Sequence, residues 1–493
     1  MTLSSQFPAH IQTLQTLQSI VGEANVLIES ADNDLVQYVR DWRGRERGVA
    51  LAVVRPNSTE QVAAIVKACA ASHAKGSGVS IVPQGGNTGM VVGSTPDASG
   101  TQVVLSLQRM NKVRKLDGGN GTITLDAGCV LQQIQETCSA AGYLFPLSLG
   151  SQGSCNIGGN LSTNAGGTQV VRFGNTRELC LGLEVVTAQG EIWSGLSGLR
   201  KDNTGYDLRD LFIGAEGTLG IITGATMKLY PQPASKLTAF AAVPSMEAAV
   251  TLLGLAHKHL SAGLTGFEVM GQFALSLVGK HFPQQRVPFL GMDGAPYCVV
   301  LENSDHESEA HAREQFERLL EAAMEDGSPN YCVVDAVIAE NITQAKALWH
   351  IRESIPLAQA QEGLNIKHDI SIPVSSIPEF VRVTDAKLAE SFPGVRLVNY
   401  GHLGDGNLHY NVQAPVGADQ AAFLTDQEAG VNALVFEMVD QFKGSISAEH
   451  GIGSLKVDKL PHHKSPVALE LMRTIKRALD PNNIMNPGRV VRV

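Results

Sequence analysis

Residues 79–89 read Val-Ser-Ile-Val-Pro-Gln-Gly-Gly-Asn-Thr-Gly, so a short apolar run, Val79–Val82, passes directly into a turn with three glycines. An apolar run that turn residues end in this way predicts a buried strand followed by a tight loop. Consecutive glycines let backbone N–H groups converge on an anion such as a pyrophosphate. Asn87 and Thr88 offer side-chain donors at the same place. The stretch therefore favours a phosphate-bearing ligand at the end of a strand.

A second polar, glycine-rich stretch runs from Gly150 to Gly167. The chain has no G-x-x-x-x-G-K-[ST] motif, and its first domain has no G-x-G-x-x-G between a strand and a helix, so the common nucleotide-binding folds are disfavoured. Any single glycine pair is more often a simple turn. Two long clusters instead favour a large cofactor with an isoalloxazine ring, a pyrophosphate and an adenine.

Apolar periodicity predicts four segments in the chain. Residues 1–45 form a helical lead-in, and residues 46–233 alternate strands with helices, one of them starting at a capping box of Ser58 and Gln61. Residues 234–444 contain two β-α-β units, the outline of a ferredoxin-like split sheet. Residues 445–493 form a C-terminal segment. The expected strands of the two units are 237–243, 265–269, 298–301 and 332–335, with helices at 246–259 and 307–324.

Composition narrows the class of protein. The chain has 493 residues and a net charge of -10, which argues against binding nucleic acid or an anionic membrane surface. Its seven cysteines are scattered without a C-x-x-C pair, as is typical of reduced thiols. It shows no targeting segment and no apolar stretch that could span a bilayer. We therefore expect a cytoplasmic protein that does not span a membrane.

His402 and His409 flank an Asp405-Gly406 pair, which is a strong hairpin-turn signal. A two-residue turn there would place His402 directly opposite His409, with Cβ atoms about 4.5–5.5 Å apart on one face. Two hydrogen-bonded core histidines are the alternative, but the pair across a turn favours a shared metal ion. Asn411 falls on the same face and could contact what the metal holds.

Glu449 is the expected third ligand, because two histidines and one carboxylate leave an open coordination position. This donor set suits zinc first, and also manganese, cobalt or iron. His450 could then act as a base beside the metal. Arg352 and Lys367 are cations within otherwise apolar elements at 342–360 and 365–374, where surface ion pairing competes with binding of a substrate carboxylate.

Pro356 should end or kink the helix just past Arg352 and so bring that arginine close to a helix terminus.

These motifs resemble the FAD-linked D-2-hydroxy-acid dehydrogenases, a branch of the vanillyl-alcohol-oxidase-type flavoproteins. The resemblance runs from about residue 45 to the C-terminus. It rests on Pro83–Gly89, Gly158–Asn160, Asn164–Gly167, Gly214–Ile221, Gly401–His409 and Glu449–Gly453. It implies an α+β fold: a two-subdomain FAD-binding domain, a ferredoxin-like α+β substrate or cap domain, and a C-terminal helical segment that returns to the FAD domain.

The resemblance also implies the roles of individual residues. His402, His409 and Glu449 would bind the metal, His450 would be the catalytic base and contact substrate, and Arg352, Lys367 and Asn411 would bind the substrate. The residues expected around the FAD are Pro83, Gly85, Gly86, Asn87, Thr88, Gly89, Leu149, Gly150, Gly153, Ser154, Ile157, Gly158, Gly159, Asn160, Ala165, Gly166, Glu216, Gly220, Ile221 and Asn486.

Two departures refine this expectation. Some relatives attach the flavin through a histidine near the first glycine loop, but no histidine lies between His73 and His257, so FAD should be non-covalent. The D-2-hydroxyglutarate branch, which Arg352–Ile355 and Lys367–Ser371 resemble most, usually has a threonine where this chain has Pro356. Proline cannot supply the distal hydrogen bond that a threonine side chain gives there.

The expected reaction is hydride transfer from Cα of a D-2-hydroxy acid to FAD, with D-2-hydroxyglutarate first and D-malate or D-lactate next. The electron acceptor would be an electron-transfer flavoprotein or a quinone, and a homodimer is one option for the assembly. Alternatives are a D-lactate or glycolate dehydrogenase of the same family, a redox-neutral enzyme that forms a flavin adduct, a metal hydrolase, and a nucleotide-binding module without activity.

Overall fold

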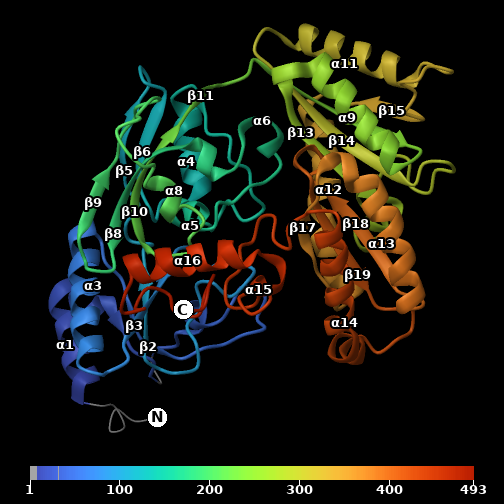
Figure 1. Ribbon diagram of the computed structural model, residues 1–493. Helices are drawn as coiled ribbons and strands as arrows, with labels where there is room; N and C mark the ends of the chain where they lie inside the picture. Colours follow the sequence, from blue (N-terminus) through green and yellow to red (C-terminus); the bar gives the residue numbers. More distant parts are fainter. Residues whose placement is uncertain (1–7, 31–32) are drawn as a thin grey trace. The chain divides into compact units, whose positions relative to one another are not determined.

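A computed structural model describes residues 8–30 and 33–493 (Figure 1). Residues 1–7 of the predicted helical lead-in lie outside the described part of the chain. Contacts within the chain divide it into two compact units. Unit 1 comprises residues 1–166, 175–231 and 449–493, and unit 2 comprises residues 167–174 and 232–448. Of the described helices, none combines the length and the apolar character that crossing a bilayer requires.

Unit 1 is built on two main sheets. The first has the order β1-β2-β4-β3, with β1 (Val26–Leu27) antiparallel to β2 (Ala50–Val54) and the pairs β2–β4 and β3–β4 parallel. The second is antiparallel, with the order β5-β6-β10-β8-β9. The remaining strands are β3 (Ser80–Gln84), β4 (Gln102–Ser106), β5 (Val113–Asp117), β6 (Thr122–Asp126), β8 (Cys180–Thr187), β9 (Ile192–Gly195) and β10 (Gly220–Lys228), and β7 (Tyr143–Leu144) pairs with β11 (Tyr230–Pro231).

Helix α3 (Thr59–Ala74) of unit 1 begins at the capping signal that the sequence predicts. Ser58 caps this helix by accepting the Gln61 N–H, while the Gln61 side chain accepts the N–H of Asn57 rather than that of Ser58. The second hydrogen bond of the capping box is therefore made by Asn57, the residue before the N-cap, and not by the N-cap itself. The other helices are α1 (Pro8–Val21), α2 (Val36–Val39), α4 (Leu131–Ala140), α5 (Ile157–Ser162), α7 (Thr176–Leu179), α8 (Arg209–Phe212), α15 (Leu460–His463) and α16 (Pro466–Leu479), with a 3-10 turn η2 (Glu23–Asn25).

Unit 2 is built on an antiparallel eight-stranded sheet with the order β15-β12-β14-β13-β18-β19-β16, and β17 also pairs with β19. Its strands are β12 (Ser235–Val243), β13 (Leu264–Gly271), β14 (Tyr297–Asp305), β15 (Asp335–Ile338), β16 (Asn365–Ile366), β17 (Asp369–Ser371), β18 (Arg396–Gly401) and β19 (Asn407–Gln413). The strand predicted at 332–335 starts at Asp335, because the N–H groups of Cys332 and Val333 instead bind the carbonyl of Ala323 at the end of a helix.

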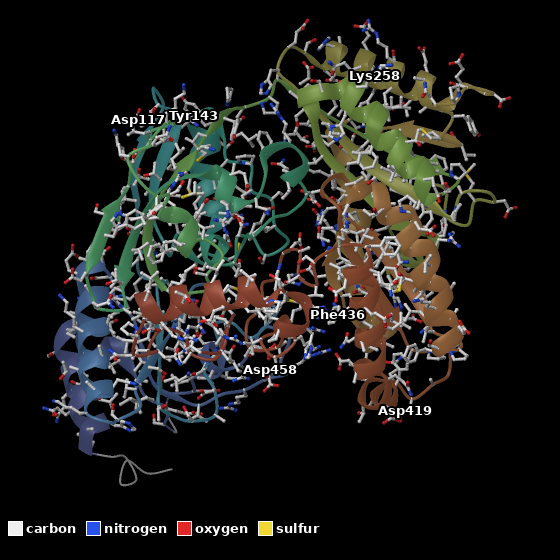
Figure 2. All side chains as sticks on the ribbon, viewed as in Figure 1. Asp117, Tyr143, Lys258, Asp419, Phe436 and Asp458 are labelled. Carbon is white, nitrogen blue, oxygen red and sulfur yellow. The ribbon has the colours of Figure 1, made fainter. Side chains whose placement is uncertain are left out.

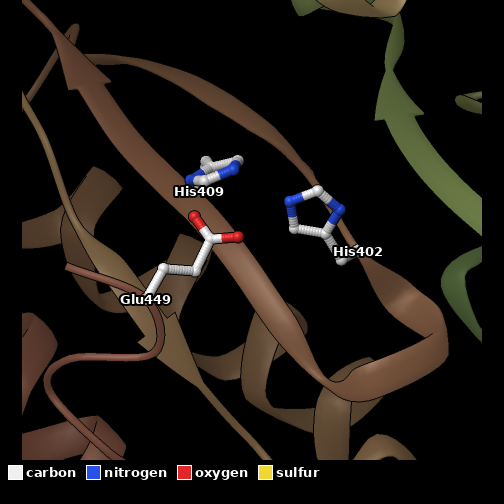
Figure 3. A group of neighbouring side chains, drawn as sticks. All are labelled: His402, His409 and Glu449. Atoms are coloured by element: carbon white, nitrogen blue, oxygen red, sulfur yellow. The ribbon is translucent and has the colours of Figure 1, made fainter. Parts of the chain in front are cut away.

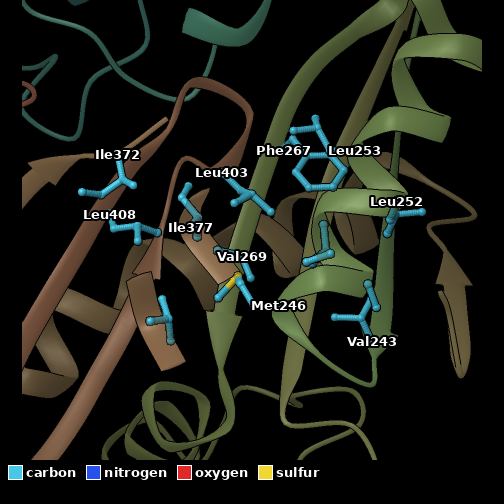
Figure 4. Packing of buried hydrophobic residues seen from close by; sticks show 14 of the residues in the cluster. Val243, Met246, Leu252, Leu253, Phe267, Val269, Ile372, Ile377, Leu403 and Leu408 are labelled. Atoms are coloured by element: carbon cyan, nitrogen blue, oxygen red, sulfur yellow. The ribbon is translucent and has the colours of Figure 1, made fainter. Parts of the chain in front are cut away.

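The central strands β12, β13 and β14 of this sheet are buried on both faces. Alternate residues of β12 enter two different cores, Ala239 and Ala241 on one side and Phe240 and Ala242 on the other. Burial on both faces explains why the strand reads as an unbroken apolar run. Figure 4 shows packing in the first core, to which Phe267 contributes. The helices are α6 (Val170–Phe173), α9 (Met246–Leu260), α10 (Gln272–His281), α11 (Glu309–Met324), α12 (Ile342–Glu362), α13 (Ile377–Ser391) and α14 (Gln420–Gln441), with 3-10 turns η3 (Ser261–Gly263), η4 (Val374–Ser376) and η5 (Leu403–Asp405).

A buried carboxylate ties the C-terminal segment to the rest of unit 1. Glu216 has a left-handed backbone, with φ of 52°, and its side chain accepts the N–H groups of Ile452 at 2.6 Å and Gly453 at 2.8 Å. The side chain of Asn486 donates to the carbonyl of the same Glu216 at 2.8 Å. The loop that follows Glu449 and His450 is thus fixed from within unit 1.

The burial of Glu216 predicts a pH-dependent stability. Burial raises the pKa of this carboxyl from 4.5 to about 7, although the two N–H donors act to lower it. Between these values the folded chain holds a proton that the unfolded chain has released, so the free energy of unfolding falls as pH rises. This difference in pKa corresponds to a change of about 3 kcal/mol in the free energy of unfolding.

The thermal midpoints of wild type and Glu216→Gln at pH 5 and pH 8 check this prediction. The amount by which the thermal midpoint of wild type exceeds that of the variant should be smaller at pH 8 than at pH 5. Glu184→Gln serves as a control. Burial acts to raise the pKa of Glu184, but hydrogen bonds from Arg114, Thr59 and Thr223 together outweigh it and lower the pKa, so the contribution of Glu184 should stay constant in this range. An advantage that stays constant between pH 5 and pH 8, as expected for Glu184, would show that the pKa of Glu216 is not raised and would contradict this prediction.

Candidate functional site

The hairpin of β18 and β19 brings His402 and His409 together, in a register that differs from the predicted one. His409 pairs with Tyr400, not with His402. His402 lies just beyond β18, where its carbonyl accepts the N–H groups of Asp405 and Asn407, each at 3.2 Å. The two imidazole rings nevertheless lie 5.5 Å apart, measured between centroids, at 73°.

The error in register has a local cause. Asp405 and Gly406 do not form a two-residue turn, because Asp405 ends the 3-10 turn η5 and Gly406 caps it with a φ of 84°. The Asp405 carboxylate also accepts the N–H of Asn407 at 3.1 Å, which stabilises the wider loop. The wider loop moves the ladder by two residues and leaves His402 outside it.

Glu449 completes a group that could hold a metal ion. One ligand atom from each of His402, His409 and Glu449 lies within 4.8 Å of the others. In Figure 3 the carboxylate points toward the two rings. Glu449 follows Ala448, whose N–H donates to the carbonyl of Asp369 at 3.3 Å beside the hairpin. Two imidazoles and one carboxylate are a donor set that fits zinc and other divalent transition metals.

Glu268 is a residue of this site that the sequence analysis missed. It lies on β13, is fully buried, and accepts from His402 Nδ1 at 2.5 Å and Arg352 Nε at 2.8 Å. Burial acts to raise the pKa of Glu268, but the interactions with His402 and Arg352 together outweigh it and lower the pKa. A carboxylate within the apolar run 264–271 was the signal that could have identified it.

Arg352 lies in the middle of α12, so the expectation of a helix terminus beside it is wrong. The helix continues through Pro356 to Glu362. Pro356 removes one backbone donor, but Ile355 and Ala358 are fully buried in the core, so packing holds the helix together around it. The Arg352 guanidinium lies 4.7 Å from the centroid of the Tyr400 ring. Within the described residues its Nη groups have no hydrogen-bond acceptor.

Lys367 and Asn411 lie at the break between β16 and β17. The pairs Ile366–Val412 and Asp369–His409 on either side place Lys367 level with Asn411. The Asn411 side chain is buried, accepts the N–H of His368 at 3.0 Å and donates to Gln359 at 2.9 Å. Asn411 therefore keeps one N–H for a ligand.

His368 is packed rather than exposed. Its ring meets that of Phe436, labelled in Figure 2, edge-on at 5.6 Å. Its Nδ1 lies 2.7 Å from the carbonyl of Tyr410. This packing fixes the backbone next to Lys367.

The two glycine-rich loops of unit 1 meet. A Cβ added at Gly86 would lie 2.0 Å from the carbonyl oxygen of Ser154, so the glycine permits this close approach. At Gly89, Gly150 and Gly159, by contrast, a Cβ would meet nothing within 4 Å, and none of the three has a positive φ. Neither packing nor backbone conformation requires these three glycines. Their free space fits a cofactor lying against the backbone.

Several of the residues expected at the cofactor also have partners in the protein. Asn87 donates to the carbonyls of Gln37 and Arg40, and Asn486 donates to the carbonyls of Gly93 and Glu216. Gly220 opens β10, where a Cβ would meet Phe212 and Val185 at about 3 Å. These side chains shape the loops, and only their remaining groups can face a cofactor.

His450 follows Glu449 in the loop that Glu216 fixes. Its Nε2 lies 3.8 Å from the Glu449 carboxylate, and its side chain is 31% exposed. The ring is therefore accessible enough to exchange a proton. All seven cysteines are buried and free of disulfides, and burial raises the pKa of each thiol, so none is a candidate nucleophile.

Comparison with known protein families matches two models to the chain. Residues 50–195 match the FAD binding domain, and residues 232–490 match the C-terminal domain of the FAD linked oxidases. The chain thus carries an FAD-binding domain, and the matched residues include both glycine-rich loops.

Several similar curated proteins are named D-2-hydroxyglutarate dehydrogenases, and one at 36% identity is named a putative D-lactate dehydrogenase. The D-2-hydroxyglutarate dehydrogenase of Xanthomonas citri pv. viticola is 38% identical over 96% of this chain and 96% of its own length. The mitochondrial D-2-hydroxyglutarate dehydrogenases of Arabidopsis thaliana and Bos taurus are 37% and 38% identical, over 96% and 92% of this chain and 80% and 78% of their own lengths.

The expected cytoplasmic location is contradicted by these relatives, since those from plants and animals are named mitochondrial. Reduced thiols and the lack of an apolar span are common to the cytosol and the mitochondrial matrix. Composition therefore could not separate the two compartments.

Solved structures agree on the fold. Alkyldihydroxyacetonephosphate synthase aligns over 98% of this chain and 85% of its own with a TM-score of 0.72 at 16% identity. p-Cresol methylhydroxylase aligns over 99% and 98% with a TM-score of 0.73 at 18% identity. The predicted α+β fold of the vanillyl-alcohol-oxidase type is confirmed. With this fold, an FAD-binding domain and these relatives, the chain belongs to the FAD-linked D-2-hydroxy-acid dehydrogenases.

Proposed function

We propose that this enzyme oxidises D-2-hydroxyglutarate to the 2-oxo acid with the help of a divalent metal ion. The observation that carries the proposal is the group of His402, His409 and Glu449, joined through Glu268 to an arginine with free Nη groups. An acid-rich chain of net charge -10 needs such local cations to attract a dianion. The names of the relatives supply the substrate.

Arg352 would bind one carboxylate of the substrate. Its Nε is held by Glu268 and its face lies against Tyr400, so the two Nη groups form a fixed two-pronged donor. Lys367 adds a second cation, level with Asn411 on the neighbouring strand. The remaining side-chain N–H of Asn411 can donate to the second carboxylate of the substrate. Pro356 offers no hydrogen bond at the position where the hydroxyglutarate branch has threonine, so Asn411 and Lys367 must select the diacid.

His402, His409 and Glu449 would hold the metal, with zinc the first candidate and manganese, cobalt or iron also suited to the donor set. A divalent ion there supplies a Lewis acid that lowers the pKa of a bound hydroxyl, and FAD supplies the hydride acceptor. His450 would take the hydroxyl proton, and Arg352 would orient the substrate so that its Cα hydrogen faces the flavin. Reoxidation then needs an external acceptor, an electron-transfer flavoprotein or a quinone.

Anaerobic flavin reduction tests the activity and the base together. D-2-Hydroxyglutarate should bleach the flavin of wild type faster than D-malate or D-lactate, and the L-isomers should not react. Replacing His450 with Asn should slow this reduction by about 100-fold or more, because the hydroxyl proton has no acceptor. The bound FAD, measured from its absorbance, should be unchanged. Reduction of the variant at the rate of wild type would remove His450 from the mechanism.

A second prediction concerns the metal. His409→Ala should abolish binding of stoichiometric Zn²⁺ to metal-free protein in calorimetry, because the site loses one of its three ligands. Flavin reduction should fall in parallel, while FAD content should stay the same. His462→Ala removes an exposed histidine in α15 and serves as the control, with binding and reduction both retained. Full activity of wild type after exhaustive chelation would refute a role for the metal.

A further inference from the structure

Glu268 occupies an unusual position for a carboxylate. It lies in the middle of β13, between Phe267 and Val269, which both pack in the hydrophobic core on the opposite face of the sheet. Its side chain is 1% exposed. A charge buried to this extent is costly unless cations and hydrogen bonds surround it.

The two oxygens of Glu268 have different partners. Oε1 lies 2.5 Å from Nδ1 of His402, and Oε2 lies 2.8 Å from Nε of Arg352. The three residues come from three separate elements: β13, the loop after β18, and α12. One carboxylate therefore connects a proposed metal ligand to a proposed substrate-binding arginine.

The contact with His402 determines which nitrogen can bind a metal. A carboxylate beside Nδ1 holds a proton there, so the lone pair of the neutral ring lies on Nε2. Nε2 is then available to the group formed with His409 and Glu449. Carboxylates in this position fix the ring orientation of a ligand and raise its basicity.

The contact with Arg352 determines which edge of the guanidinium is available. Glu268 occupies Nε, and the Tyr400 ring covers one face. The Tyr400 ring also lies 4.8 Å from that of His409, so the arginine and both histidines belong to one packed cluster. Only the Nη groups remain for a ligand.

Stability alone does not explain this carboxylate. Replacing a buried ion pair with apolar residues of similar volume is often neutral or stabilising, whereas removal of one partner is costly. Met270, two residues along β13 and on the same face as Glu268, is buried in an apolar core, so this face of the strand accommodates apolar side chains. The three-way contact is better explained by the geometry that it imposes on the site.

We propose that Glu268 is a shared positioning residue, which directs His402 Nε2 toward the metal position and the Arg352 Nη groups toward the substrate carboxylate. This inference rests on the proposed function, and it adds that metal binding and substrate binding are coupled. Metal binding and carboxylate binding depend on the same side chain, so one substitution should weaken both.

Glu268→Gln tests the coupling, because it keeps the shape of the side chain but retains only one strong acceptor for two donors. Two affinities are measured on FAD-loaded protein: Zn²⁺ binding to metal-free protein by calorimetry, and binding of 2-oxoglutarate from the change in the flavin spectrum. We expect Zn²⁺ to bind about 10- to 100-fold more weakly. The 2-oxo acid should also bind at least several-fold more weakly, in protein that retains its FAD.

Glu362→Gln is the matched control. Glu362 is a largely buried carboxylate in the same unit, paired with Lys280, His281 and Arg396, but it contacts none of the site residues. Its loss should lower the thermal midpoint and leave both affinities unchanged. A parallel loss of both affinities in this control would reduce the effect of Glu268 to general destabilisation and overturn the proposal.

Glu268→Asp keeps the charge but is one methylene shorter, so it cannot reach both donors. It provides the test if the glutamine variant does not fold, and at least one of the two affinities should fall. Wild-type values for both affinities in either folded variant overturn the proposal. Wild-type protein that reduces its flavin but binds no divalent ion would refute the metal in the proposed function, and with it the coupling through Glu268.

Discussion

The contact of the buried Glu268 carboxylate with His402 and Arg352 is the interaction on which the geometry of the site depends. His402 is outside the ladder of β18 and β19, so backbone pairing does not fix its ring. The arginine stands on a long helix that reaches the sheet through side chains alone. A short, charged contact between the two gives both a defined orientation, which a loop or a long side chain alone would lack.

Unit 1 uses a buried carboxylate in a different way. Glu216 is satisfied by backbone N–H groups instead of cations, and it fixes a loop rather than a side chain. Backbone donors carry only partial charge, so burial still raises the pKa of Glu216 to about 7, whereas the interactions of Glu268 with Arg352 and His402 lower the pKa of that group. The two carboxylates thus hold the parts of the chain that carry the proposed catalytic residues.

Local signals predicted the elements well and their details less well. The apolar run of β12 and the cap of α3 depend on neighbouring residues, so sequence patterns could indicate them. The Asp405-Gly406 pair predicted a turn but not its size, which depends on the hydrogen bonds of the His402 carbonyl. Pro356 predicted a helix end that core packing of α12 overrides.

The sequence by itself determined the glycine-rich loops and the two histidines around a turn, which follow from local backbone freedom and from the chemistry of single side chains. The expectation of FAD and a 2-hydroxy acid came from the resemblance of these motifs to a known family. Only the tertiary structure decided that Glu268 joins His402 to Arg352 and that Glu216 holds the loop after His450. The partners are 84 to 236 residues apart in the chain, and no local pattern encodes a contact between side chains so distant in sequence.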